Sequence, residues 1–313
     1  MQVFRGFAVS SAVLAFFIAV LGSWVRINDA GLTCPDWPLC HGQLIPPLGG
    51  GVVLEWSHRL VAFVEGFVVL GTIVSGIRMR RRIAGVTTAL VALGTIFAAQ
   101  VSLGGATVLL GNSPPSVMLH WAMGMALLAD LTILAVLSLA ASAPATGPSR
   151  ERSRLLGSAA VAPAVAAAFA FATMCLGAYV SSSYAGLACA GFPSCDAASF
   201  GPAQALQMAH RLAAGAFALT AAYAAASAWQ AGPSRACAFA AGGFVLVLVQ
   251  VVLGAANVYG HLPIALREAH AANAAATFVA FVVAATLAAL GPRAALARHG
   301  RRLGGASRVT THA

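Results

Sequence analysis

The stretch GSWVRINDAGLTCPDWPLC, residues 22–40, recurs as GAYVSSSYAGLACAGFPSC at residues 177–195. The two copies align without a gap at an offset of 155, which superimposes both of their cysteines. Two shorter matches extend the alignment: EWSHRL (55–60) with QMAHRL (207–212) at an offset of 152, and QVSLGGATV (100–108) with QVVLGAANV (250–258) at 150. Self-similarity at a nearly constant spacing predicts two halves of the same architecture.

The composition is that of a membrane protein. Of the 313 residues, 60% are hydrophobic and 8% are charged, against roughly 25% charged residues in ordinary soluble domains. A helix needs about 20 mainly apolar residues to cross a bilayer. Eight stretches qualify: 4–25, 55–77, 83–110, 116–141, 155–181, 203–229, 236–258 and 267–290. We therefore expect an all-α membrane protein with eight transmembrane helices, arranged as two pseudo-symmetric four-helix bundles.

The arginines predict the topology. Eight spans place both termini on one side, and fourteen of the 18 basic residues fall on that side, which the positive-inside rule makes cytoplasmic. The cysteine-containing loops would then lie on the outer face of the cell membrane. Each half has an even number of spans, so the two halves have the same orientation in the membrane. They should be related by a pseudo-symmetry axis along the membrane normal. The net charge of +10 is explained by topology and contact with anionic membrane lipid, and we expect no nucleic-acid partner.

The expected domain organisation follows from these spans. Residues 1–142 form the N-terminal half and residues 155–292 the C-terminal half. A proline- and serine-rich cytoplasmic linker, 143–154, joins them, and a basic cytoplasmic tail follows at 293–313. The first apolar run lacks a small-residue cleavage site, so we expect it to be retained as a span.

The first outer loop of each half contains one cysteine pair and lies where conditions are oxidising. They are Cys34 with Cys40 and Cys189 with Cys195. Two intraloop disulfides are the simplest interpretation, and redox-active pairs that exchange with a thiol carrier are the alternative. The six-residue spacing is not that of a zinc site. We expect His41 to be an exposed loop residue, and Cys175 and Cys237 to be packing residues.

Four histidines recur at matched depth near the outer ends of the even-numbered spans: His58, His120, His210 and His270. One such histidine alone would most often be a packing residue. A repeated pair in each half instead suits axial ligation of a haem iron between facing helices of a four-helix bundle. Zinc would require three or four ligands, so haem is the better fit.

Three arginines lie beside these histidines. Arg59 and Arg211 directly follow His58 and His210, and Arg267 precedes His270 by one turn. At that depth a guanidinium can bind haem propionates. The alternative is that these side chains merely extend to the membrane interface.

The two halves differ at one acidic position near the first histidine. Glu55 lies three residues before His58, on the same helical face, and the aligned residue in the other half is Gln207. Glutamine resembles glutamate in shape but carries no charge. We therefore predict that the first half holds the chemical site, with Glu55 as a proton acceptor or stabilising charge. A carboxylate that simply pairs with Arg59 is the alternative.

Two deeper acids, Glu65 and Asp130, are also confined to the first half. Carboxylates inside a membrane are costly and are functional candidates by default. A proton path or a mutual hydrogen bond is conceivable for them, but ordinary polar contacts between helices are the expectation.

These residues together resemble the haem A synthase family of membrane enzymes. The resemblance covers nearly the whole chain through GLTCPDWPLCHGQ, EWSHR, LHW, AHR and REAH. It implies an oxidoreductase that converts haem O to haem A by successive oxidation of the C8 methyl to a formyl, with water as the oxygen source. It also implies that His58 and His120 hold the substrate haem O and that Glu55 is catalytic.

The same resemblance implies a resident haem B on His210 and His270, through which electrons leave, and disulfides in both cysteine loops. The electron acceptor is left open, with quinone one option, and haem O synthase or oxidase assembly factors are further expected partners. Two other functions remain open: a haem carrier or oxidase assembly factor, and a dihaem cytochrome linked to quinone. Because the second loop lacks Asp36 and Trp37, we predict that the first loop is a lid over the substrate site.

Overall fold

A computed structural model describes residues 1–141, 160–196 and 199–306 of the chain. The described part is helical, with no strand, and confirms the expected fold class. Its helices are α1 (Gln2–Ile27), α2 (Gly51–Ile77), α3 (Val86–Leu109), α4 (Pro114–Ala140), α6 (Val161–Ser182), α7 (Pro202–Gln230), α8 (Arg235–Tyr259) and α9 (Ile264–Ala306). All eight are long and apolar enough to cross a membrane, α9 through its segment Ile264–Leu290. The protein is a multi-pass membrane protein.

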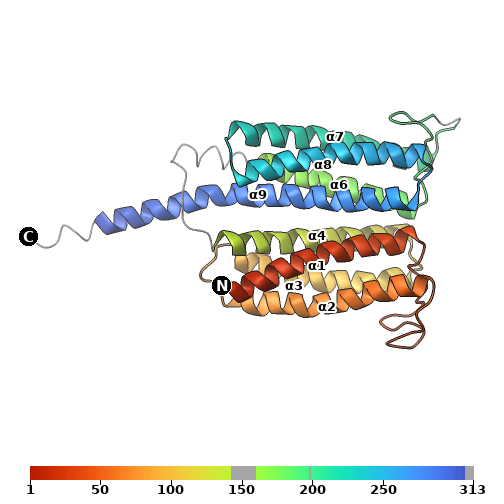
Figure 1. Ribbon diagram of the computed structural model, residues 1–313, viewed down its shortest axis with the longest axis horizontal. Coiled ribbons are helices and arrows are strands. Elements are labelled where there is room, and N and C mark those ends of the chain that lie inside the picture. Colours follow the sequence, from red (N-terminus) through yellow and green to blue (C-terminus); the bar gives the residue numbers. More distant parts are fainter. Residues whose placement is uncertain (142–159, 197–198, 307–313) are drawn as a thin grey trace, which may run out of the picture.

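The helices form two groups that match the two halves of the sequence (Figure 1). In the first half, α1 and α3 each contact both α2 and α4, so that α2 and α4 stand at opposite corners of a four-helix bundle. In the second half, α6 and α8 each contact both α7 and α9, which again places two helices at opposite corners. The histidine-bearing helices of each half are these corner pairs.

The halves pack through α4, which contacts α6 and α9, and through α1, which contacts α9. Leu128, Leu131 and Leu134 on α4 and Phe281 on α9 belong to one buried cluster that extends through both halves. Alanines such as Ala221 and several others in this cluster let helix backbones approach closely, as is typical of membrane bundles.

Residues related by the 155-residue offset meet at the boundary between the halves. The Arg26 guanidinium donates to the Ser181 carbonyl oxygen at 2.9 Å, and the Tyr184 hydroxyl donates to Asp29 Oδ1 at 3.0 Å. Arg26 also lies over the Tyr184 ring, 4.8 Å from its centroid. Contacts between equivalent positions are what a two-fold relation between the halves would produce.

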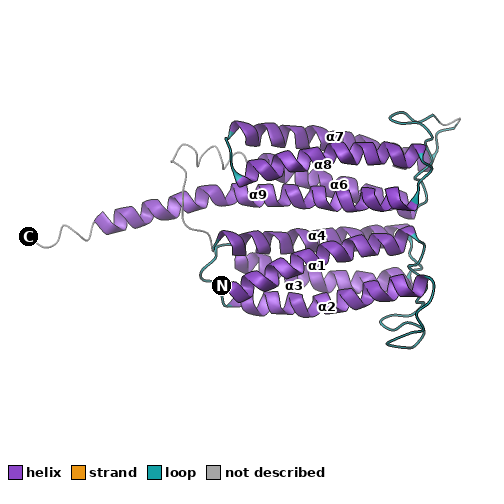
Figure 2. Cartoon of the chain, in the orientation of Figure 1, coloured by secondary structure: helices purple, strands orange, loops and turns teal. Residues whose placement is uncertain are grey.

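The N-terminus and the C-terminal end of α9 lie at one end of the molecule, and both cysteine loops lie at the other (Figure 2). Which compartment each end faces stays a prediction. Helix α9 runs on to Ala306, well past the expected span end at 290. Helix α6 begins at Val161 rather than at 155; the linker 143–154 lies outside the described residues.

Candidate functional site

Both cysteine pairs are bonded within their loops, as expected. Cys34–Cys40 and Cys189–Cys195 form disulfides, each with a Cα–Cα distance of 4.6 Å. The remaining cysteines are free: Cys237 is buried and Cys175 is half-buried, in keeping with a packing role. Each disulfide closes a compact loop over the end of its bundle near which the histidines lie.

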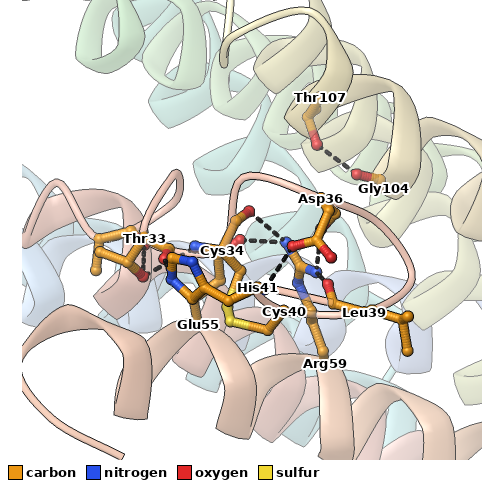
Figure 3. Close-up of polar contacts among 11 residues, drawn as sticks. Thr33, Cys34, Asp36, Leu39, Cys40, His41, Glu55, Arg59, Gly104 and Thr107 are labelled. Atoms are coloured by element: carbon orange, nitrogen blue, oxygen red, sulfur yellow. Dashed lines mark hydrogen bonds and ion pairs between the residues drawn. A yellow bond between two sulfur atoms is a disulfide. The ribbon is translucent and has the colours of Figure 1, made fainter. Parts of the chain in front are cut away.

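Arg59 holds the first loop from below (Figure 3). Its guanidinium donates to the carbonyl oxygens of Asp36 (2.7 Å), Leu39 (2.6 Å) and Cys34 (3.0 Å), and it forms an ion pair with Glu55. A loop this short leaves several carbonyls without partners of their own, and a planar group with five donors satisfies them together. The expected propionate contact of Arg59 stays a prediction, because its donors face the loop here.

The second half repeats this arrangement. Arg211 donates to the carbonyl oxygens of Pro193 (3.1 Å), Ser194 (2.6 Å) and Cys189 (3.3 Å). Arg267 instead reaches across the boundary to the Ile27 carbonyl oxygen at 3.3 Å. The sequence did not reveal the loop-holding role of Arg59 and Arg211, although both follow a histidine at the same place in the repeat.

Glu55 is 4% exposed and supports the same loop. Its Oε2 accepts hydrogen bonds from the Cys34 backbone N–H at 2.8 Å and the Thr33 hydroxyl at 3.0 Å (Figure 3). Together with the Arg59 ion pair, these contacts fix the position of the carboxyl group. The carboxylate is thus held rigidly, one turn above His58.

Gln207 makes the equivalent contacts in the second half. Its Oε1 accepts from the Cys189 backbone N–H at 2.6 Å, and its amide nitrogen donates to the Gly186 carbonyl oxygen at 2.6 Å. Both residues therefore anchor a cysteine loop. What distinguishes Glu55 from Gln207 is its charge.

Asp36 shapes the far side of the first loop. Its carboxylate accepts from the backbone N–H of Gly42 at 2.8 Å and of His41 at 2.7 Å. These hydrogen bonds, with Gly42 the largest contributor, hold the pKa of Asp36 below its usual value. His41 is exposed as expected, and its Nε2 pairs with the Thr33 carbonyl oxygen at 2.9 Å.

Trp37 of the first loop lies against α3. A Cβ added at Gly105 would come within 3.0 Å of the Trp37 ring, so the indole requires glycine there. In the second half the corresponding residues are Phe192 and Ala255, a smaller ring with a larger helix residue. The Trp37 ring therefore covers α3 at Gly105, the residue next to Gly104.

Each of the four histidines packs edge-on against a glycine of the preceding helix. Each also lies six to eight residues after the first residue of its own helix, α2, α4, α7 or α9, a depth of about 10 Å at 1.5 Å per residue. A Cβ built on the glycine would approach the histidine Cε1 to 2.9 Å (Gly22 and His58), 3.1 Å (Gly104 and His120), 3.0 Å (Gly177 and His210) and 3.3 Å (Gly254 and His270).

The glycines allow each imidazole to reach the backbone of the neighbouring helix. Nδ1 of His210 pairs with the Thr173 carbonyl oxygen at 3.1 Å, which leaves Nε2 as the ring nitrogen available to a metal. Metal-bound histidines commonly use their second nitrogen in this way. The other three Nδ1 atoms are buried without a hydrogen-bond partner among the described residues. The sequence showed the glycine pairs in its repeat, but their contact with histidine was not foreseen.

The two histidines of each half lie on its opposite corner helices. His58 and His120 lie on α2 and α4, and His210 and His270 lie on α7 and α9. Within the part of the chain that the structure describes, no group of three or more His, Cys, Asp or Glu side chains could hold a metal ion. A haem iron takes its other four ligands from the porphyrin, so two imidazoles in a glycine-lined bundle fit a haem.

Three other acids are buried in the helices. Glu65 is 2% exposed, and neither of its oxygens has a partner within the described chain; Asp130 Oδ2 is likewise unpaired. The expected polar contacts between helices are therefore wrong for Glu65, and it makes no hydrogen bond with Asp130. Glu268 on α9, whose two carboxyl oxygens are also without a partner among the described residues, was overlooked, although it is an acid inside a predicted span.

These features define a helical multi-pass membrane protein built from two repeated four-helix bundles, each with a histidine pair beneath a disulfide-closed loop. The chain belongs to the cytochrome oxidase assembly protein family, COX15-CtaA, which matches residues 5–49 and 51–282.

Its relatives confirm the resemblance found in the sequence. It is 29% identical to the Heme A synthase of Geobacillus thermodenitrificans over 280 residues, which cover 85% of this chain and 86% of that protein. It is 28% identical to the Heme A synthase of Bacillus pumilus over 221 residues, 67% of this chain and 70% of that protein. A shorter match, 29% over 103 residues, links 33% of the chain to 22% of the Protoheme IX farnesyltransferase of Haloarcula marismortui.

Proposed function

We propose that this protein is a haem A synthase, which oxidises the C8 methyl group of haem O to a formyl group. In this proposal His58 and His120 hold the substrate haem O, and His210 and His270 hold a resident haem B. The observation that carries it is the set of four histidines, each seated on a glycine of the preceding helix and paired within a half. Relatives named Heme A synthase that match up to 85% of the chain support it.

The overall reaction sets what the site must accomplish. One methyl group and one water give a formyl group, four protons and four electrons; two quinones that accept these become two quinols. Haem B, when bound, supplies one-electron relay chemistry between the substrate site and such an acceptor. The protein must hold the methyl-bearing edge of the substrate next to a base, and it must exclude bulk water.

Glu55 is the base or stabilising charge in this proposal. It lies one helical turn from His58 on the same face. Arg59, Thr33 and the Cys34 N–H keep its carboxylate in place. A carboxylate so held can accept a proton from the substrate or stabilise positive charge that develops on it, without reorganising during the reaction. The loop that carries Trp37 would cover this site and limit access of water.

The Glu55→Gln variant tests this role separately from folding. Gln207 shows that glutamine can hold the equivalent loop through the same backbone N–H, so we expect normal folding and normal haem B content. Loss of a general base costs about 10²–10⁴ in rate, and haem O should accumulate in place of haem A. Pigments extracted from membranes and separated by chromatography give the ratio; an unchanged haem A yield would remove Glu55 from the mechanism.

A carrier or assembly factor that binds haem without altering it is the second candidate, favoured by the description of the family as cytochrome oxidase assembly protein. It predicts that cells with and without the gene have the same ratio of haem A to haem O. The replacement of Glu55 by Gln207 in an otherwise matched anchor weighs against it, because binding alone gives no reason for the added charge.

A further inference from the structure

Glu65 lies on the interior face of α2, two turns deeper than His58. The seven-residue separation brings the two side chains onto one face of the helix, about 10.5 Å apart along the axis. Glu65 is 2% exposed, and neither carboxyl oxygen has a partner among the described residues. A buried polar group without a partner costs free energy, so this position calls for a ligand.

The second half has no polar group at this place. The position equivalent to Glu65 is Phe217, which is 6% exposed and packs edge-on against Phe281 with ring centroids 5.9 Å apart. Glu65 is therefore not needed to build a histidine-bearing bundle. The two bundles share their loop anchors and their glycine-seated histidines, and they differ at this deep, buried position.

We propose that Glu65 binds the hydroxyl group of the hydroxyethylfarnesyl side chain of haem O and so selects the farnesylated haem for the first half. This inference rests on the proposed function. Haem O differs from haem B only in that side chain, so a site that must distinguish them has to recognise it. Phe217 would offer the corresponding edge of haem B an apolar surface.

The depth of Glu65 suits this contact. The charged propionates of a haem leave one edge of the macrocycle and would favour the polar end of the bundle beneath the cysteine loop, so the opposite edge, which bears the farnesyl chain, would point toward the membrane interior. The apolar chain gains from this placement, but its hydroxyl group is then removed from water and needs a partner. A carboxyl group two turns below the iron-binding histidine would lie on the side of the macrocycle from which this hydroxyl group extends.

The test compares two haems that differ in one group. Purified full-length protein is loaded with an equimolar mixture of haem O and an analogue with the same farnesyl chain but no hydroxyl, and the retained haems are extracted and quantified. We expect wild-type protein to favour haem O by about tenfold, as one buried hydrogen bond would give. Glu65→Leu should reduce this preference to about one, and Glu65→Gln should retain most of it.

Asp130→Leu is the matched control, because it removes another buried carboxyl group of the same half, and it should leave the preference unchanged. The haem B content of the second half reports folding in every variant. If Glu65→Leu does not accumulate, Glu65→Met, closer to glutamate in shape, takes its place with the same expectation. An undiminished preference for haem O in the leucine or methionine variant overturns the role of Glu65. His58→Ala should abolish the binding of farnesylated haem to the first half. If the wild-type protein shows no such His58-dependent binding of either farnesylated haem, the proposed function is refuted instead.

Discussion

Replacing one histidine-facing glycine by alanine should empty one haem site and spare the other. At Gly177 the added Cβ would lie 3.0 Å from Cε1 and 3.5 Å from Nδ1 of His210, whereas ordinary contact begins at 3.4 Å. The imidazole cannot simply swing away, because its Nδ1 pairs with the Thr173 carbonyl oxygen at 3.1 Å. The ring must therefore shift by a few tenths of an ångström, and this shift breaks or misaligns the hydrogen bond to Thr173.

The magnitude follows from the cost of overpacking. Extra carbon atoms in a well-packed interior cost about 1–3 kcal/mol, and each 1.4 kcal/mol weakens binding about tenfold. Gly177→Ala should thus weaken haem B binding by about 5- to 140-fold. Gly22→Ala, whose Cβ would approach His58 to 2.9 Å, should have the same effect on haem O in the first half and leave haem B in place.

Haem content per chain after purification and titration with added haem measures both effects. The matched controls are Gly215→Ala on α7 and Gly6→Ala on α1, since a Cβ at either position meets nothing within 4 Å. These variants should retain haem as wild-type protein does. If Gly177→Ala binds haem B with undiminished affinity, the glycine is not a seat for a ligating histidine, and the assignment of His210 loses its main support.

Three further outcomes are expected. Trp37→Ala should lower haem A formation about tenfold with haem B content unchanged, because the indole that covers α3 at Gly105 is lost; equal loss of both haems would mean that the loop only supports folding. Asp36 has a lowered pKa in the folded protein, so its support of the loop is present above its unfolded pKa of about 3.9 and is lost as the pH falls through the folded value. After correction for the intrinsic exchange rate, which itself falls on acidification, the protection of the loop amides should therefore decrease at low pH, and Asp36→Asn should show reduced protection already at neutral pH; identical protection in both proteins would contradict this. Arg26→Ala removes contacts between the halves and should destabilise the protein by about 1 kcal/mol, read as a lower Tm, whereas an unchanged Tm would show that the apolar core alone joins the halves.

The sequence predicted the helices because the signal for a membrane span is simple: about 20 apolar residues. Eight spans were expected, and the described part of the chain contains eight helices that could cross a membrane, most with ends within a few residues of the expected ones. The span within α9 ends at Leu290 as expected, but the continuation of the helix to Ala306 was not predicted, because that segment is rich in arginine and glycine and lacks the apolar signal. The disulfides were predictable for a different reason, namely the duplication of two cysteines in loops that are otherwise divergent.

The contacts of the site were less predictable. Arg59 binds three loop carbonyls, a role that was not foreseen, because no sequence pattern reveals which carbonyls of an irregular loop lack partners; its contact with a propionate stays a prediction. The glycines opposite the histidines were visible as aligned pairs, such as Gly22 with Gly177. Their meaning required the packing of neighbouring helices, because small residues serve close helix contact throughout membrane bundles.

The comparison of Glu55 with Gln207 changes once their contacts are known. In the sequence, the glutamate looked like an addition made for chemistry alone. The structure gives both residues the same structural task, since each accepts the backbone N–H of the first cysteine in its loop. Glutamine performs that task without charge, so loop support does not explain why the first half carries a carboxylate. A buried charge that must be held by Arg59 is the costlier choice, and a site in which positive charge or a proton appears during the reaction gives a reason for it. The first half is therefore the better candidate for the reacting site, although both halves are built to hold a haem.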